Sequence, residues 1–312
     1  MKATLEQEPF MRVVFMGTPG ISGKSLKRLY SDGHDVAAVF TQPDRPKGRG
    51  MQRSFSPVKE LALEYGTPVY QPVSMRDGIA EGILDDLKCD LVVVVAFGKI
   101  LPREVLEKPP FGSINIHGSL LPEYRGAAPA QWAILNGEKV TGVTSLYMNE
   151  GIDAGDMIFS MPVPIGDEET AGDLLEKLGD VGAQLLSETV DAIASGSVVR
   201  RPQDHSKATF APALTKAMSQ INWTDSAYRI KCRVRGLRPW PGASAELQGR
   251  LLKVLAVDID ETGTGRNPGD IVFTDKRGIG VACADGVVVI RELQAPGGKH
   301  MNSADYIRGH LF

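Results

Sequence analysis

Cysteine is scarce in this chain of 312 residues, and its spacing excludes several kinds of site. The three cysteines are Cys89, Cys232 and Cys283, and none lies within four residues of another. Neither a Cys-x-x-Cys redox pair nor a local zinc knuckle can therefore form. Unpatterned thiols are typical of a reducing compartment, where they act as small buried hydrophobic groups. We predict three buried cysteines and no metal site.

Long apolar segments are also missing. The longest run, 91–97, is far too short to cross a bilayer. Residues 1–10 lack the apolar core of a signal peptide and the arginines of a transit peptide, so we interpret them as an extension ahead of a natural start near Met11. We expect a soluble, cytoplasmic protein.

Charge is unevenly distributed along the chain. Residues 213–312 hold 14 Lys and Arg against 10 Asp and Glu, a net +4, whereas residues 1–212 hold 21 against 28, a net −7. A basic C-terminal part on an acidic chain suggests a polyanionic partner. Four extra charges also fit an ordinary solvated surface, so the pattern alone leaves both interpretations open.

The first two thirds of the chain alternate strand patterns with helical ones. Strands are predicted at 12–17, 36–41, 69–71, 91–97, 113–116 and 140–148. Helices are predicted from the turn after 17 to 31, and at 57–65, 78–87, 127–135 and 170–194, with a loop at 42–57. This alternation predicts βαβ units, and therefore an α/β fold with a mostly parallel sheet.

The pattern changes after a polar, proline-interrupted segment at 196–214. A helix is predicted at 221–234, followed by strands at 243–247, 251–258, 270–273, 278–283 and 287–293. Short strands separated by Gly and Asp turns predict a small β-barrel. We therefore expect one domain at 1–195, a linker at 196–214 and a second domain at 215–312.

Residues 18–25, TPGISGKS, nearly form a phosphate-binding P-loop. The pattern needs glycine where Thr18 stands, and Pro19 removes one of the backbone N–H donors that cradle a phosphate. We interpret the segment as a tight strand–helix turn with Lys24 on the helix surface.

Asn115, His117 and Asp153 are the candidates for chemistry. Asn115 and His117 share one face of an extended chain where a predicted strand runs into a loop, the edge at which sites form in α/β sheets. An amide can donate to a developing oxyanion, an imidazole can shuttle protons, and a carboxylate can orient the imidazole. Taken alone, however, Asn-x-His is more often a capped strand end with a satisfied histidine.

Three segments strengthen the catalytic interpretation: 115–122 (NIHGSLLP), 125–129 (RGAAP) and 151–156 (GIDAGD). Together they resemble the signature of the 10-formyltetrahydrofolate-dependent formyltransferases. The resemblance implies a Rossmann-like catalytic domain over about 11–195 and a catalytic trio of Asn115, His117 and Asp153. It also implies a site for the reduced folate lined by Phe97, Gly98, Ile100, Leu101, Ser119, Leu120, Leu121 and Pro122.

Two further segments concern the amine that accepts the formyl group. Residues 42–50 resemble an inserted loop of the family members that act on tRNA-bound methionine, which implies tRNA contacts at Arg45, Lys47 and Arg49. Residues 230–242 and 294–299 resemble the appended OB-like domain of the same members, which implies contacts at Lys231 and Arg235. Trp240 in that segment is expected to be a packing anchor.

The combination implies 10-formyltetrahydrofolate as formyl donor and initiator Met-tRNA as partner, and we expect a monomer. Gly20 and Ile21 depart from the family pattern, in which an acidic or bulkier residue and an aromatic one are expected. No tRNA contact is assigned to Leu311-Phe312, because the chain has no basic tail there. Two alternatives stay open: a nucleotide-sugar formyltransferase, and a tRNA- or folate-binding module with an inactive site.

Overall fold

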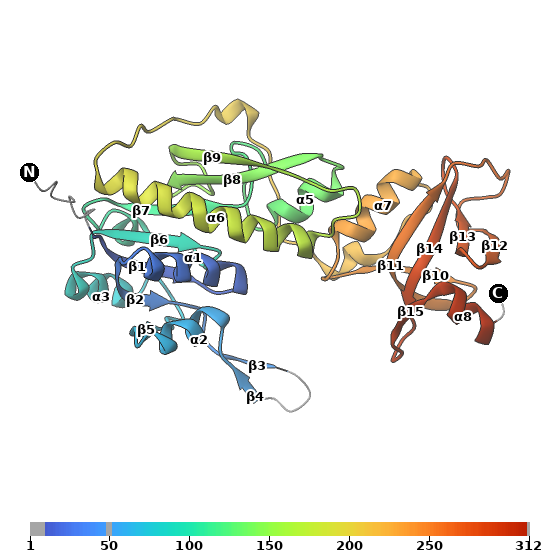
Figure 1. Ribbon diagram of the computed structural model, residues 1–312, viewed down its shortest axis with the longest axis horizontal. Helices are drawn as coiled ribbons and strands as arrows, with labels where there is room; N and C mark the ends of the chain where they lie inside the picture. The colour runs from blue at the N-terminus through green and yellow to red at the C-terminus, as the bar shows by residue number, and fades with distance from the viewer. Residues whose placement is uncertain (1–9, 48–51, 311–312) are drawn as a thin grey trace, which may run out of the picture. The chain divides into compact units, whose positions relative to one another are not determined.

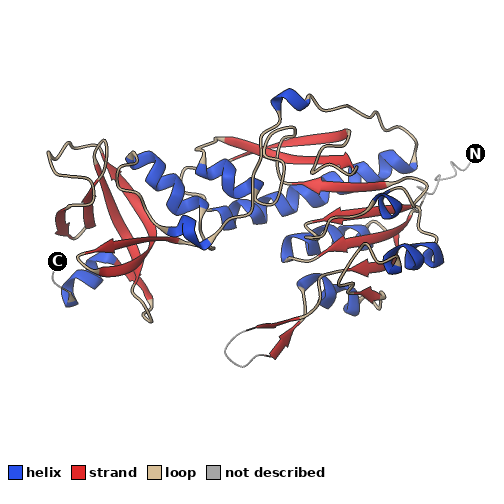
Figure 2. Ribbon diagram, turned by 180° about the vertical axis from the view of Figure 1, so that it is seen from behind, coloured by secondary structure: helices blue, strands red, loops and turns tan. Residues whose placement is uncertain are grey.

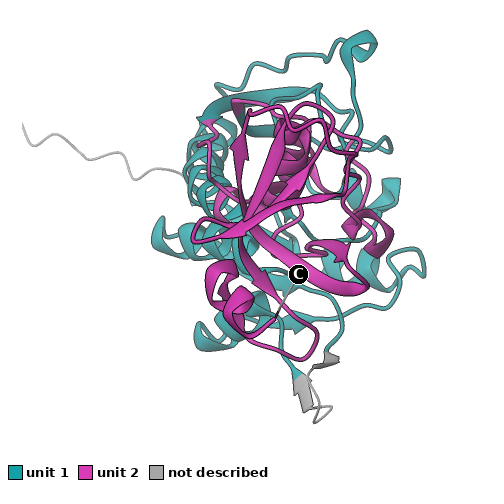
Figure 3. Cartoon of the chain, turned by 90° about the vertical axis from the view of Figure 1, so that its right-hand side faces the viewer, with its two compact units in different colours: residues 1–127, 141–163, 175–210 teal, residues 128–140, 164–174, 211–312 magenta. Residues whose placement is uncertain are grey.

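The computed structural model describes residues 10–47 and 52–310. Helices and strands alternate as far as the long helix α6 (Ala171–Ala194), and strands predominate after it (Figures 1 and 2). The chain divides into two compact units, coloured separately in Figure 3. Unit 1 comprises residues 1–127, 141–163 and 175–210, and unit 2 comprises 128–140, 164–174 and 211–312.

Unit 1 is built on a seven-stranded sheet with the order β5-β2-β1-β6-β7-β8-β9. Neighbours from β5 to β7 are parallel, and β8 runs antiparallel to β7. Every residue of β6 is buried, as expected for a strand covered on both faces. The predicted α/β fold with a mostly parallel sheet is confirmed. The strands are β1 (Arg12–Gly17), β2 (Asp35–Phe40), β5 (Val69–Tyr70), β6 (Leu91–Val95), β7 (Ser113–His117), β8 (Val140–Tyr147) and β9 (Met157–Pro164).

Two strand predictions in this part of the chain were wrong. Strand β9 was not expected, and the prolines at positions 162 and 164 fit its place at the sheet edge, where a missing N–H does no harm. Residues 42–57 were expected to be a loop, but they contain a hairpin of β3 (Arg45–Lys47) and β4 (Gln52–Ser54).

Two helices of this part, α2 and α6, begin with side-chain caps. Ser56 caps α2 by accepting from the backbone N of Lys59, and Thr170 and Asp173 exchange hydrogen bonds at the start of α6. Lys24 on α1 lies against α6, with its Nζ 2.9 Å from carboxylates of Glu176 and Asp180. The helices are α1 (Gly20–Ser31), α2 (Pro57–Glu64), α3 (Ile79–Leu87), the unpredicted α4 (Arg103–Leu106), α5 (Pro129–Leu135) and α6.

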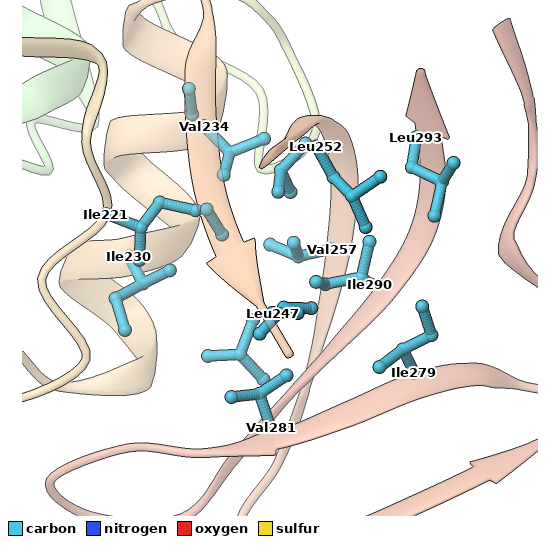
Figure 4. Packing of buried hydrophobic residues seen from close by; sticks show 14 of the residues in the cluster. Ile221, Ile230, Val234, Leu247, Leu252, Val257, Ile279, Val281, Ile290 and Leu293 are labelled. Atoms are coloured by element: carbon cyan, nitrogen blue, oxygen red, sulfur yellow. The ribbon is translucent and has the colours of Figure 1, made fainter. Parts of the chain in front are cut away.

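Unit 2 holds an antiparallel sheet with the order β10-β11-β14-β13-β12, and β15 also pairs with β14. Its core packs apolar residues of α7, such as Ile230 and Val234, against strand residues such as Leu252 and Ile290 (Figure 4). The predicted small β domain is confirmed, although β15 and α8 were not foreseen. The elements are α7 (Ala227–Gly236), β10 (Ala243–Leu247), β11 (Arg250–Asp260), β12 (Ile271–Asp275), β13 (Gly278–Ala282), β14 (Val287–Gln294), β15 (His300–Asn302) and α8 (Ser303–Gly309).

Several single-residue predictions can be checked against burial. All three cysteines are buried, as predicted. Burial raises the pKa of the Cys89 thiol to about 11, so it is an inert structural group. Trp240 is 53% exposed, so the prediction that it is a packing anchor was wrong. Among residues 10–47 and 52–310, no helix is long and apolar enough to span a membrane.

Candidate active site

Asn115, His117 and Asp153 lie together in unit 1. Strand β7 places Asn115 and His117 on one face, and the loop after β8 brings Asp153 to them. The Asn115 amide nitrogen donates to Asp153 Oδ1 at 3.1 Å, and His117 Nδ1 lies 3.5 Å from Asp153 Oδ2. The three predicted residues therefore lie together, and the catalytic role of each stays a prediction.

The Asp153 carboxylate holds the cluster together. The backbone N of Gly126 donates to Asp153 Oδ2 at 2.8 Å, and His117 Nε2 lies 2.9 Å from the carbonyl oxygen of Tyr124. The loop after β7 therefore contacts both the acid and the imidazole. The His117 side chain is only 6% exposed and that of Asp153 15%, so their interaction is weakly screened by water.

The backbone around Asp153 is unusual. Asp153 has a φ of +47°, in the left-handed region that Asp tolerates better than most residues. Gly155, two residues on, passes so close to β8 that a Cβ atom there would lie 1.8 Å from the Tyr147 carbonyl oxygen. The loop thus needs a glycine at 155 to carry Asp153 to the cluster.

The predicted folate-binding residues follow the carboxyl ends of β6 and β7, which are adjacent strands. Gln42 fixes the first segment by donating from Nε2 to the carbonyls of Phe97 at 3.0 Å and Gly98 at 3.2 Å. Thr144 fixes the second by donating to the Ser119 carbonyl at 2.7 Å. Phe97, Leu101, Ser119 and Leu121 are buried, Leu120 and Pro122 are half-buried, and Gly98 and Ile100 are exposed. Both segments thus lie at the carboxyl ends of β6 and β7, on the side of the sheet where β7 carries its catalytic candidates.

The predicted tRNA contacts are distributed over two places. Arg45 and Lys47 belong to the short strand β3, and Arg49 lies outside the described residues. Lys231 Nζ is paired with Glu168. Arg235 is buried and donates to the carbonyls of Gly166 at 2.8 Å and Glu169 at 3.2 Å. The ion pair of Lys231 and the hydrogen bonds of Arg235 thus give both α7 side chains partners within unit 2. Their contact with tRNA stays a prediction.

One contributor to the site was missed by sequence reasoning. Gln203 lies in the segment expected to be a linker, and its side-chain amide reaches the loop that carries Asp153. Arg125 was noted only as part of a motif, yet its buried guanidinium contacts Gln203. Fifty residues separate positions 153 and 203, so no local spacing signalled the contact.

Potential metal ligands are not grouped in the described residues. In the described part of the chain, no group of three or more His, Cys, Asp or Glu side chains is arranged to hold a metal ion.

Comparison with known proteins identifies the family of the chain. Residues 11–190 match the formyl transferase family, and residues 213–311 match the C-terminal domain of the same family. The chain belongs to the formyl transferase family. It is 46% identical over 301 residues to a methionyl-tRNA formyltransferase from Acetivibrio thermocellus, covering 96% of this chain and 97% of that one. A methionyl-tRNA formyltransferase from Alkaliphilus oremlandii is 44% identical over 300 residues, with the same coverage.

Two solved structures have a similar fold at low sequence identity. HypX from Aquifex aeolicus in complex with tetrahydrofolic acid superposes with a TM-score of 0.65 at 19% identity, covering 96% of this chain and 47% of that longer one. An N-formyltransferase from Helicobacter canadensis, in complex with folinic acid and dTDP-3-aminofucose, gives a TM-score of 0.69 at 19% identity, covering 89% of this chain and 98% of that one. At this identity the likeness concerns the fold alone.

Proposed function

We propose that this chain transfers a formyl group from 10-formyltetrahydrofolate to the amino group of methionine on initiator Met-tRNA. The observation that carries the proposal is the cluster of Asn115, His117 and Asp153 at the carboxyl edge of the sheet. It occurs in a chain that matches proteins named methionyl-tRNA formyltransferase over almost its whole length. The product serves translation initiation, and the reaction belongs in the cytoplasm, where charged tRNA is used.

The chemistry assigned to the cluster is acyl transfer without a covalent enzyme intermediate. The methionine nitrogen attacks the formyl carbon, and negative charge grows on the formyl oxygen. Asn115 donates its amide N–H to that oxygen, and His117 shares in the stabilisation. The bond between the formyl carbon and N10 of the folate then breaks, and N10 takes the proton that the amine loses. His117, oriented by Asp153, carries that proton.

The two co-substrates are assigned to different parts of the chain. The segments around Phe97–Leu101 and Ser119–Pro122 hold the folate beside the cluster. Arg45, Lys47 and Arg49 contact the acceptor end of the tRNA, and residues 215–312, with Lys231 and Arg235, form a second tRNA-binding domain. Residues 1–195 form the catalytic domain, and the protein acts as a monomer.

A direct assay tests the acceptor. Formyl transfer from 10-formyltetrahydrofolate is measured to initiator Met-tRNA, to free methionine and to a dTDP-amino sugar, each at two salt concentrations. We expect fast formylation of Met-tRNA only, weakened by salt, because phosphate contacts release counterions. Formylation of the sugar instead would keep the assigned chemistry and contradict the acceptor. No transfer to any acceptor would contradict the proposed function.

A further inference from the structure

Gln203 bridges the Asp153 loop and Arg125. Its Nε2 donates to the backbone carbonyls of Asp153 at 2.8 Å and Gly155 at 2.7 Å. Its Oε1 accepts from Arg125 Nη2 at 2.6 Å and Nε at 3.2 Å. Carbonyl oxygens can only accept and a guanidinium can only donate, so these partners fix which way the amide points.

The bridge is buried, and further contacts hold its Arg125 end. Gln203 and Arg125 are 7% and 5% exposed. Arg125 Nη2 also lies 3.0 Å from His205 Nδ1, and the backbone N of Arg125 donates to the Thr209 carbonyl at 2.9 Å. Residues 201–210 therefore contact both the loop that carries Asp153 and the loop after β7 that carries Arg125, rather than forming a passive linker.

We infer that Gln203 is a positioning residue that holds Asp153 in catalytic geometry, a role that rests on the proposed function. Asp153 has a left-handed backbone, which persists only where the surroundings over-determine it. Two hydrogen bonds from one amide on either side of residue 154 supply that constraint. Because the side-chain direction of Asp153 follows from its backbone, loss of the bridge moves the carboxylate away from His117.

The decisive experiment is a double-mutant cycle between Gln203→Leu and Asp153→Asn. Asparagine is chosen because it also tolerates left-handed backbone. In the wild-type background we expect Gln203→Leu to lower kcat by about 10²-fold, the cost of roughly 1 Å of misplacement, with KM for both co-substrates nearly unchanged. In the Asp153→Asn background, Gln203→Leu should have little further effect. Equal losses in both backgrounds would overturn the inference.

Two controls distinguish a loss of positioning from a loss of folding, and from a failure of the proposed function. Gln184→Leu makes the same change at an exposed glutamine of α6 and should leave kcat unchanged. Hydrogen exchange of the backbone amides at 148–156 can be measured without a formyl acceptor. It should be faster in Gln203→Leu than in the wild type, while exchange in β6 stays slow. An unaltered loop would contradict the inference even if formylation of Met-tRNA failed for other reasons.

A second, independent observation concerns the outer face of the sheet in unit 2. Ser244, Lys253 and Gln294 are paired in register across β10, β11 and β14, and His300 of β15 pairs with Gln294. Directly opposite residues share a face, and the flanking row of Ala243, Val254 and Leu293 is buried. The four polar side chains therefore form a row on the side away from the core.

A cavity of about 330 Å³ lies over part of this row. Its lining combines an ammonium group from Lys253, hydroxyls from Ser219 and Ser244, and the amide of Gln294 with apolar surface from Leu251 and prolines. Leu251 and Trp240, beside the lining residue Pro241, are each 53% exposed. Among the described contacts, Lys253 has no acidic partner.

We also propose that this cavity binds one unstacked nucleotide of the tRNA substrate, with Lys253 on its phosphate. A cation beside amide, hydroxyl and apolar groups suits a nucleotide, since a base offers hydrogen-bonding edges and a flat apolar face. The net +4 of residues 213–312 favours an anionic occupant. This site rests on the proposed function, because it assigns part of the tRNA to unit 2.

Charge reversal tests the site with a matched control. Lys253→Glu should weaken binding of uncharged initiator tRNA, measured by fluorescence anisotropy, by about tenfold and reduce the slope of log affinity against log salt by about 1. Lys276→Glu makes the same change at the exposed β12–β13 turn and should have a much smaller effect. Equal effects of the two variants would show general electrostatics only and overturn the site. Because binding is read directly, the outcome is separate from whether formylation occurs.

Discussion

The candidate active site and the basic helix α7 each contain polar residues that lie close together in sequence. The two regions differ in what those residues contact. Asn115 and His117 share a strand face and meet a third residue from a separate loop. Lys231 and Arg235 share a helix face, and that face lies on the segment at 166–169 of their own unit. Residues on one face of a strand or helix therefore share their surroundings. The segment that packs against that face decides whether they form a functional site or only structural contacts.

The largest expected effect belongs to the active site. His117→Ala should lower kcat by about 10²–10⁴-fold, because it removes the group assigned to proton transfer. The affinity for tRNA, measured separately by anisotropy, should stay within about twofold because His117 is nearly buried and is not assigned to tRNA binding. Turnover close to that of the wild type would show that the chemistry has been assigned to the wrong residues.

A substitution that displaces the backbone of the loop carrying Asp153 tests the geometry of the same site. Gly155→Ala places a Cβ 1.8 Å from the Tyr147 carbonyl, so the loop must move. We expect a loss in kcat of about 10²-fold, as for other small misplacements of catalytic groups. Gly82→Ala in α3 is the matched control, because a Cβ there meets nothing within 4 Å. Similar kinetics for both variants would mean that the loop does not set the geometry.

Arg235 of the basic helix is assigned to tRNA binding, and its buried hydrogen bonds add an expected effect on stability. Arg235→Ala leaves two carbonyl groups without their buried donor, which should lower the free energy of unfolding by about 2 kcal/mol. Thermal denaturation should show the loss as a decrease of several degrees in the transition of unit 2. A higher KM for tRNA at unchanged stability would instead support the predicted direct contact of Arg235 with tRNA.

The sheet and the face shared by Asn115 and His117 were predictable from the sequence, whereas the contacts of Gln203 and Arg235 were not. Strand alternation was enough to predict the sheet, and the two-residue spacing of Asn115 and His117 was enough to place them on one face, because strand geometry fixes both. Asp153 joined them only through the resemblance to the family. The position of Gln203 could not be predicted, since it depends on how the segment after α6 returns along the loop. The inward direction of Arg235 was equally hidden, because residue type does not reveal which helix face meets a neighbour.

The weakest effect is expected for Lys231, which lies on the same helix as Arg235. Lys231 is 17% exposed and pairs with Glu168, whose side chain is 62% exposed, so solvent screens the ion pair from the Glu168 side. Lys231→Ala should therefore change the free energy of unfolding by less than about 1 kcal/mol, in contrast to Arg235→Ala. If tRNA binding weakens measurably in Lys231→Ala, the predicted contact is supported, because so small a change in stability cannot explain it. If neither property changes, Lys231 is a solvated surface residue, and the tRNA contacts of unit 2 must be sought among other cations such as Lys253.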